Sequence, residues 1–295
     1  MASPRISSAS KLNRRSFLKA GLAGIAGFAL YSGEIARHVI DIPRPEIRLP
    51  NLPAAFDGFR IVQLSDIHLD EFTEPFFLRV AVDRVNRLRP DPVFLTGDFV
   101  THELLPRKWS IHSAWTCAGI LDGLQCRQRY AVLGNHDVAV NALAVTAALT
   151  AGNIVVLRNS FTAIERGSSR LWLAGVDDPL EGSPDIGRAI PEFIRNRTGE
   201  PIVLMCHAPD FADDVLKHPA GPAVQFMLSG HTHGGQLRFP FVGPLDLPEL
   251  GKKYIEGLFH LQGLQLYVNR GLGTVGVPFR LNCPPEITAI TLRRG

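Results

Sequence analysis

The amino-acid sequence predicts an α/β sandwich that forms one domain from about residue 55 to the end of the chain. Three features lead to this prediction. Short apolar runs of β type alternate with segments of helical periodicity. The composition, 45% hydrophobic and 20% charged in 295 residues, is that of an ordinary globular protein. Polar residues follow directly after several of the apolar runs.

The expected elements begin in the order β-α-β-α-β and continue as further strands. The helix at 74–88 is predicted because its apolar residues fall on one face and Pro90 follows its end. The other expected helices are 110–124 and 141–150. Strands are expected at 59–64, 92–96, 130–133, 171–174, 202–206, 224–228, 264–268 and 286–292.

Positive charge is concentrated before the domain. Five of the 31 basic residues lie before residue 34 and no acidic residue does, so the remainder has a net charge of about −2. A near-neutral domain has no basic surface that would attract nucleic acid. Nucleic-acid binding is therefore not expected.

Residues 1–34 have the order of an export signal, with basic residues followed by an apolar run and then polar residues. The pair Arg14-Arg15 precedes Phe17 and an apolar run over 20–32. This pattern resembles the twin-arginine signal, which is read by the twin-arginine export machinery. The alternatives are an ordinary basic start or a single membrane span, although the run is shorter than the ~18 residues of a spanning helix.

The apolar run is not followed by a clear cleavage site, so residues 1–34 are expected to act as a cleaved signal peptide or as a signal anchor. Because all positive charge lies before the run, the domain is expected outside the cytoplasm, in the periplasm or on the outer face of the cytoplasmic membrane. Residues 35–57 contain four prolines and are expected to form an extended linker. The domain is then expected to cover 58–295.

Five of the apolar runs end at side chains that can bind metal ions, and in α/β sheets sites form at the C-terminal ends of strands. Carboxylate, amide and imidazole groups without thiolates suit Mn²⁺, Fe²⁺ or Zn²⁺. Two such ions need a bridging ligand, and a carboxylate can reach both. The residues at the ends of the five runs are Asp66, Asp98, Asn135, His207 and His231.

The complete set of motifs is Asp66-x-His68, Gly97-Asp98, Gly134-Asn135-His136-Asp137, His207 and Gly230-His231-Thr232-His233. In this order the motifs resemble those of the calcineurin-like metallophosphoesterases, from about residue 59 to residue 235. The resemblance implies two packed mixed β-sheets flanked by helices. It also implies a first metal ion held by Asp66, His68 and His233. A second ion would be held by Asn135, His207 and His231, with Asp98 between the two ions.

The resemblance also assigns roles beside the metal ions. His136 would be the catalytic residue that stabilises charge on the phosphoryl oxygen or protonates the leaving group, and Asp137 would orient its imidazole. Thr101 stands where family members often have Asp or Asn, a departure that affects only the surroundings of the metal site. Arg270 and Arg280 lie in a segment resembling that of an often exported or membrane-anchored branch. They are expected either to bind substrate phosphate or to be structural.

The predicted function is metal-dependent hydrolysis of a phosphate ester or pyrophosphate bond, most consistent with a phosphodiesterase. In this prediction a hydroxide bridging two metal ions attacks phosphorus. A phosphomonoesterase is the alternative enzyme, and a non-catalytic protein-binding scaffold is the alternative of another class. The presence of every expected ligand disfavours the scaffold. The apolar stretches 239–250 and 258–264 suit an amphipathic or lipid-linked substrate.

Overall fold

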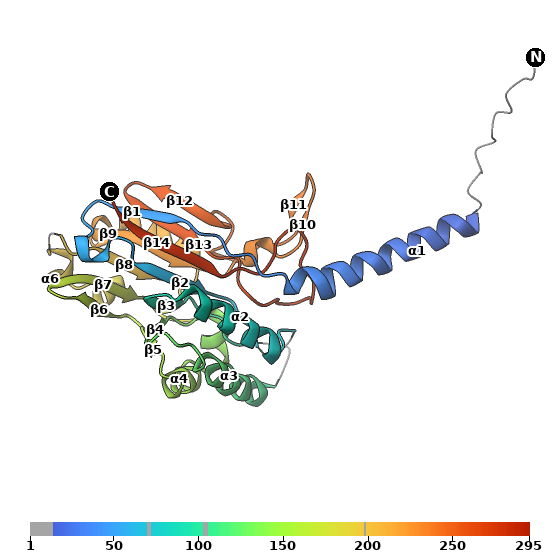
Figure 1. The fold of residues 1–295 in the computed structure, drawn as a ribbon, viewed down its shortest axis with the longest axis horizontal. Coiled ribbons are helices and arrows are strands. Elements are labelled where there is room, and N and C mark those ends of the chain that lie inside the picture. The colour runs from blue at the N-terminus through green and yellow to red at the C-terminus, as the bar shows by residue number, and fades with distance from the viewer. Residues whose placement is uncertain (1–13, 70–71, 103–105, 198) are drawn as a thin grey trace, which may run out of the picture.

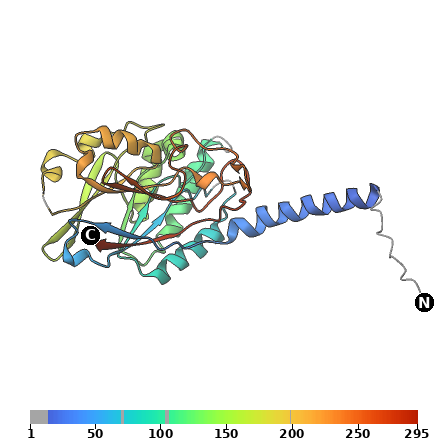
Figure 2. The same cartoon turned by 90° about the horizontal axis from the view of Figure 1, so that it is seen from above.

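Two six-stranded β-sheets pack against each other, and helices cover their outer faces (Figure 1 and Figure 2). A computed structural model describes residues 14–69, 72–102, 106–197 and 199–295. The arrangement confirms the prediction of an α/β fold with two packed mixed sheets.

The first sheet has the strand order β1-β14-β2-β3-β4-β5 and is parallel except where β14 pairs with β2. Its outer face is covered by three helices (Figure 1). The strands are β1 Glu46–Leu49, β2 Arg60–Leu64, β3 Pro92–Leu95, β4 Gln128–Ala131, β5 Val155–Val156 and β14 Thr288–Arg294. The helices are α2 Pro75–Leu88, α3 Arg107–Leu121 and α4 Asn135–Ala151.

The second sheet has the order β12-β13-β9-β8-β7-β6, with antiparallel pairs only at its two edges. Three short helices lie on its outer side, and a separate two-stranded hairpin, β10–β11, stands apart from both sheets. The strands are β6 Ser160–Arg166, β7 Ser169–Gly175, β8 Ile202–Met205, β9 Val224–Ser229, β10 Arg238–Phe239, β11 Gly243–Pro244, β12 Gly257–Leu261 and β13 Leu264–Val268. The helices are α5 Ile186–Ala189, α6 Glu192–Arg195 and α7 Ala212–Lys217.

Three apolar clusters fill the spaces between the four layers. In β3, Phe94 packs between the two sheets, whereas Val93 and Leu95 pack against the helices of the first sheet. In β8, Val203 likewise lies between the sheets and Leu204 lies under the outer helices. Both faces of these strands are buried, and for this reason the sequence shows unbroken apolar runs rather than alternation.

Each predicted helix and strand is present, most with shifted ends and β13 with the predicted bounds. The largest difference concerns α4, which was expected at 141–150 but begins at Asn135. Asn141 breaks the helical geometry inside α4 with a φ of 177°, so the apolar periodicity showed only the second part. Strands β1, β5, β6, β10, β11 and β12 were not predicted. β5 has only two residues, and β6 and β12 are half-exposed edge strands with a weaker apolar signal.

The segment 35–57 differs from the expected linker. Strand β1 lies inside it and pairs in parallel with β14, with Ile47 opposite Leu292. Ile47 and Leu49 are completely buried between the two sheets. Part of the predicted linker therefore belongs to the folded domain.

Helix α1, Arg14–Leu30, projects from one end of the domain (Figure 1). None of its side chains is buried. It continues through a short π-helical turn, Tyr31–Ile35, and a 3₁₀ turn, Ala36–His38, into the domain. Among the described residues, no helix combines the length and hydropathy needed to cross a membrane. The basic residues of the predicted signal that precede Arg14 lie outside the described residues.

Candidate metal centre

The seven predicted metal ligands all lie just beyond the C-terminal ends of five strands. Three of these strands belong to the first sheet and two to the second, so the candidate site lies where the edges of both sheets meet. The strands are β2 for Asp66 and His68, β3 for Asp98, β4 for Asn135, β8 for His207 and β9 for His231 and His233.

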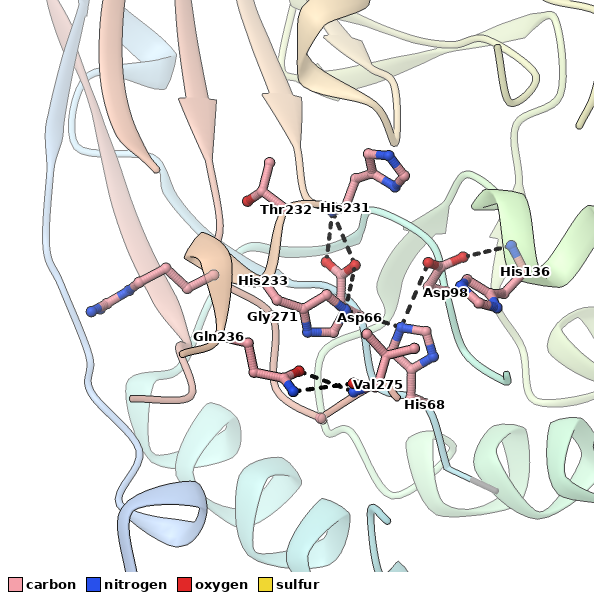
Figure 3. A network of polar contacts seen from close by, with 12 residues as sticks. Asp66, His68, Asp98, His136, His231, Thr232, His233, Gln236, Gly271 and Val275 are labelled. Carbon is pink, nitrogen blue, oxygen red and sulfur yellow. Dashed lines mark hydrogen bonds and ion pairs between the residues drawn. The ribbon is translucent and has the colours of Figure 1, made fainter. Parts of the chain in front are cut away.

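Six of the seven side chains form two groups, each able to hold one metal ion. The first group is Asp66, His68 and His233, and the second is Asp98, His207 and His231. Within each group the candidate ligand atoms lie within 4.8 Å of one another, and all six residues are buried. Figure 3 shows Asp66, His68 and His233 converging, with Asp98 beside them.

Asp98 lies between the two groups. Its Oδ2 atom is 3.0 Å from Nε2 of His207 and 3.6 Å from Nε2 of His68. One carboxylate is therefore within reach of both candidate ion positions, as a bridging ligand requires.

Three of the histidines have one ring nitrogen fixed by a neighbour, which leaves the other nitrogen for a metal ion. Nδ1 of His207 lies 2.6 Å from the carbonyl oxygen of Thr96. Nε2 of His231 lies 2.7 Å from the carbonyl oxygen of Glu249. A carbonyl oxygen only accepts hydrogen bonds, so each of these nitrogens carries the proton. Nδ1 of His68 lies 3.0 Å from the hydroxyl of Thr101.

The protonation of His68 and His231 also fits a metal ion. Burial lowers the pKa of His68 to about 3 and that of His231 to about 4. Both imidazoles are therefore neutral near pH 7 and have a free lone pair, the form that binds metals. Burial raises the pKa of Asp66 to about 6. A bound cation would favour its ionised form.

Asn135 provides a second test of whether the residues of the site fit a metal ion. Its Oδ1 atom is buried and has no hydrogen-bond partner in the described structure. An unsatisfied buried amide oxygen costs about 1–3 kcal/mol. The residue lines the same cavity as Asp98 and His231, so an ion held there would satisfy the oxygen.

Five of the seven candidate ligands have left-handed backbone geometry, which is rare for residues other than glycine. Their φ angles lie between 47° and 74°. Strain of this kind persists only where surrounding contacts hold it, and it is concentrated at functional sites. The five residues are Asp66, His68, Asp98, His231 and His233.

Two glycines of the motifs allow the loops to approach one another. A Cβ atom on Gly134 would lie 2.1 Å from Oδ1 of Asp98. One on Gly230 would lie 2.3 Å from Oδ2 of Asp66. Any side chain at either position would displace a candidate metal ligand.

His136 lies at the edge of the site. Its backbone N–H donates to Oδ1 of Asp98 at 3.0 Å (Figure 3). Its ring packs edge-on against His68, with 5.0 Å between the centroids, and the residue lines the cavity. The backbone N–H of His102 donates to Nδ1 at 2.9 Å. Nδ1 is therefore an acceptor, and the proton of the neutral ring is on Nε2.

Asp137 does not orient His136, and this expectation was wrong. The buried Asp137 carboxylate accepts hydrogen bonds from the backbone N–H groups of Asp98, Phe99 and Gly134, at 2.8–3.0 Å. It holds the loop that carries Asp98. Asp137 and His136 are adjacent at the start of α4, but their side chains contact different groups. The hydrogen bond to Nδ1 of His136 comes from the backbone N–H of His102 instead.

The two arginines considered for phosphate binding are both engaged within the protein. Arg280 is completely buried, and its guanidinium donates to the backbone carbonyls of Gly271, Gly273 and Cys283. Arg270 pairs with Glu286 and Asp41. Neither arginine lines the cavity, so the geometry agrees with the structural alternative.

Three groups that position the histidines were not identified from the sequence. The carbonyls of Thr96 and Glu249 belong to the backbone and carry no residue-type signal. Thr101 was noted only as a departure from the family pattern, and its contact with His68 gives that position a role.

A cavity of about 440 Å³ opens beside the two groups. Asp98, Asn135, His136 and His231 line one part of it. Another part of the wall is apolar and consists of Leu237, Leu245, Leu247, Pro248, Val275 and Val277. No arginine or lysine of the described chain lines it.

The sequence model of the calcineurin-like phosphoesterases matches residues 59–235, and the chain belongs to this family. Family membership, together with the two groups of candidate metal ligands, defines the chain as a metal-dependent hydrolase acting on phosphate ester bonds.

Curated relatives agree with this assignment. The metallophosphoesterase YkuE of Bacillus subtilis is 34% identical, over 96% of this chain and 98% of its own length. The phosphodiesterase YaeI of Escherichia coli is 30% identical, over 95% and 99%. A zebrafish (Danio rerio) transmembrane protein with a metallophosphoesterase domain is 32% identical, over 92% of this chain and 61% of that longer protein.

Proposed function

We propose that the chain is a phosphodiesterase that works outside the cytoplasm. The observation that carries the preference for diesters is the lining of the cavity. A phosphate monoester has up to two negative charges and no second organic group. A diester has one charge and two organic groups. Beyond the metal-binding groups, the described lining has no cation but has a broad apolar wall, which fits the second group of a diester.

In this proposal Asp66, His68 and His233 hold one divalent ion, and Asn135, His207 and His231 hold the other, with Asp98 between them. The ions would be Mn²⁺, Fe²⁺ or Zn²⁺, and when bound they supply an activated water and neutralise charge on the phosphoryl group.

The chain itself contributes orientation and a hydrogen-bond donor. His136 lines the cavity, and we assign its Nε2–H to a phosphoryl oxygen whose charge grows during the reaction. The water oxygen forms a bond to phosphorus, one P–O ester bond breaks, and the leaving alkoxide takes up the proton that the water gives up. Support also comes from the relative YaeI, which is named a phosphodiesterase.

Turnover of two nitrophenyl esters tests the preference. The metal-loaded chain should hydrolyse bis(4-nitrophenyl) phosphate with a kcat/KM about ten-fold above that for 4-nitrophenyl phosphate, which corresponds to about 1.4 kcal/mol. A higher kcat/KM for the monoester would establish the alternative, a phosphomonoesterase.

We also infer export by the twin-arginine route, to the periplasm or the outer face of the cytoplasmic membrane. The inference rests on Arg14-Arg15 and the apolar segment that follows them. Cell fractionation tests it, because the inference requires the chain to be absent from the cytoplasm at steady state.

A further inference from the structure

The mouth of the cavity carries exposed apolar side chains. Leu245 and Val277 both line the cavity and are 60% and 40% exposed. Phe241 and Val242, at the turn of the β10–β11 hairpin, are exposed and precede Leu245. Leu245 and Val277 thus belong both to the wall of the cavity and to the exposed surface, and Phe241 and Val242 lie in the hairpin whose second strand directly precedes Leu245. We call these four residues the apolar rim. Clusters of this kind mark sites of protein or membrane contact.

Helix α1 begins its projection beside the same hairpin. The rings of Phe28 and Phe239 stack with centroids 6.5 Å apart. The carbonyl of Ser32 accepts a hydrogen bond of 3.0 Å from the backbone N–H of Arg280, three residues after Val277. Figure 1 shows α1 and the hairpin at the same end of the domain. The base of α1 is thus fixed next to the apolar rim.

The chemistry of α1 identifies what this end contacts. Residues 20–30 of α1 are all apolar and its large apolar side chains are exposed, whereas a helical segment that is apolar on all sides is stable only inside protein or lipid. Apart from the contact of Phe28 with Phe239, no described element of the chain covers them. Its basic residues lie at the distant N-terminal end, where they would meet anionic lipid head groups. The exposed apolar side chains include Phe17, Leu18, Leu22, Ile25 and Leu30.

We propose that α1 and the apolar rim rest in a lipid bilayer, and that the cavity takes the phosphate group of a lipid whose hydrocarbon chain lies along the apolar wall. This substrate class rests on the proposed function as a phosphodiesterase. The phosphate group of the lipid would reach the metal-binding groups. Its hydrocarbon chain would pass between Leu245 and Val277 and continue along the rest of the apolar rim. Hydrolysis adds water across one P–O ester bond and yields an alcohol and a phosphate monoester. One of these two products keeps the hydrocarbon chain.

The position of the rim can be measured without turnover. The full-length Phe241→Cys variant is labelled with a nitroxide and added to vesicles of phosphatidylglycerol and phosphatidylethanolamine. Leu143→Cys is the matched control, because Leu143 is 77% exposed on α4. Cys117, Cys206 and Cys283 are buried, and labelling of the unsubstituted chain gives the background from Cys126. In the presence of vesicles, we expect the nitroxide at position 241 to be accessible to oxygen and shielded from an aqueous nickel complex. The nitroxide at position 143 should not be shielded.

Two outcomes overturn the membrane contact. One is a label at 241 that stays accessible to the nickel complex in vesicles. The other is equal shielding of 241 without vesicles, which would show that a second copy of the chain covers the rim. Both results are independent of whether the chain hydrolyses diesters.

Two matched diesters test the substrate class. They are 4-nitrophenyl hexadecyl phosphate in the same vesicles and 4-nitrophenyl ethyl phosphate in solution, which share the scissile bond and leaving group. We expect the wild-type rate ratio to favour the hexadecyl ester by about ten-fold or more, because its hydrocarbon chain removes apolar surface from water when it lies along the apolar wall. Phe241→Ser/Val242→Ser should lower this ratio by about ten-fold, whereas Leu143→Ser should keep it.

A ratio near one in the wild type would reject the lipid substrate even if the rim is shielded. Hydrolysis of neither ester would reject the phosphodiesterase activity, while the spin-label result would still decide the membrane contact.

Discussion

Oδ2 of Asp98 lies 3.0 Å from Nε2 of His207. The two atoms come from different sheets, one beyond β3 and the other beyond β8. The contact therefore joins the two halves of the site, and a metal ion between such atoms would stabilise the packing of the sheets as well as the chemistry.

Asp98→Asn should remove most of the bound metal and nearly all hydrolysis, because a neutral amide cannot hold two dications together. Metal content by inductively coupled plasma mass spectrometry, together with the rate on bis(4-nitrophenyl) phosphate, measures both effects. Asp246→Asn is the matched control, since Asp246 lines the cavity outside both metal-binding groups and should keep two ions. Two ions per chain and a full rate in Asp98→Asn would remove Asp98 from the bridging position.

His136→Ala should keep the metal content and lower the rate by roughly 10²–10⁴, the range for one electrostatic or acid–base group. Because Nδ1 accepts a hydrogen bond from His102, we expect a neutral Nε2–H donor that stabilises charge. The loss should then be equal for diesters with good and poor leaving groups. A smaller loss for the nitrophenol ester would instead show that His136 protonates the leaving group. Loss of a metal ion would make it a ligand.

Thr101→Val should weaken metal binding by about 10–100-fold, because the hydroxyl that positions the His68 ring is lost. The valine has nearly the same shape, so the melting temperature of the metal-free protein should change little. Thr101→Ser keeps a hydroxyl and should restore most of the affinity, measured by Mn²⁺ titration. If serine and valine weaken binding equally, the contact with His68 is not the cause.

Metal binding to the chelator-treated protein should release protons, and the affinity should fall as the pH falls. Burial raises the pKa of Asp66 to about 6. Burial opposes the charge on His207, yet the nearby Asp98 carboxylate raises its pKa well above the usual value. A metal ion binds the deprotonated forms, so it displaces both protons. Calorimetry of Mn²⁺ binding at pH 6 in two buffers of different ionisation enthalpy measures the release. Identical heats in both buffers would contradict it.

Arg14→Lys/Arg15→Lys should retain the chain in the cytoplasm with its fold intact, because the twin-arginine signal is read through its guanidinium groups. Fractionation followed by immunoblotting measures the exported share. Arg293→Lys/Arg294→Lys makes the same change at the other end of the chain and should be exported normally. Normal export of the first variant would replace the twin-arginine route by an ordinary signal anchor.

Much of the site could be predicted because its signals are local. A carboxylate, amide or imidazole directly after a buried strand is visible in the sequence, as for Asp98 after β3 and His207 after β8. The ends of such strands meet at one edge of a sheet, so the chemistry followed from order and residue type.

Other properties depend on contacts that the local sequence does not encode. Strand β1 is four residues long and lies among prolines, and it exists because β14, more than two hundred residues away, pairs with it. Asp137 was assigned to its neighbour His136, but the fold directs its carboxylate to the backbone of the Asp98 loop. Arg280 was equally consistent with phosphate binding until its burial among carbonyl groups was known.

The sequence by itself predicted the α/β class, the proposed export signal and the set of candidate donor atoms, because periodicity, charge order and residue type are properties of short segments. Only the tertiary structure decided which nitrogen of a histidine is left for a metal ion. In His231, Nε2 is hydrogen-bonded to the carbonyl oxygen of Glu249, which leaves Nδ1. It also placed the base of α1 beside the β10–β11 hairpin. These relationships depend on distances between segments far apart in the chain, which are set when the sheets and loops pack together.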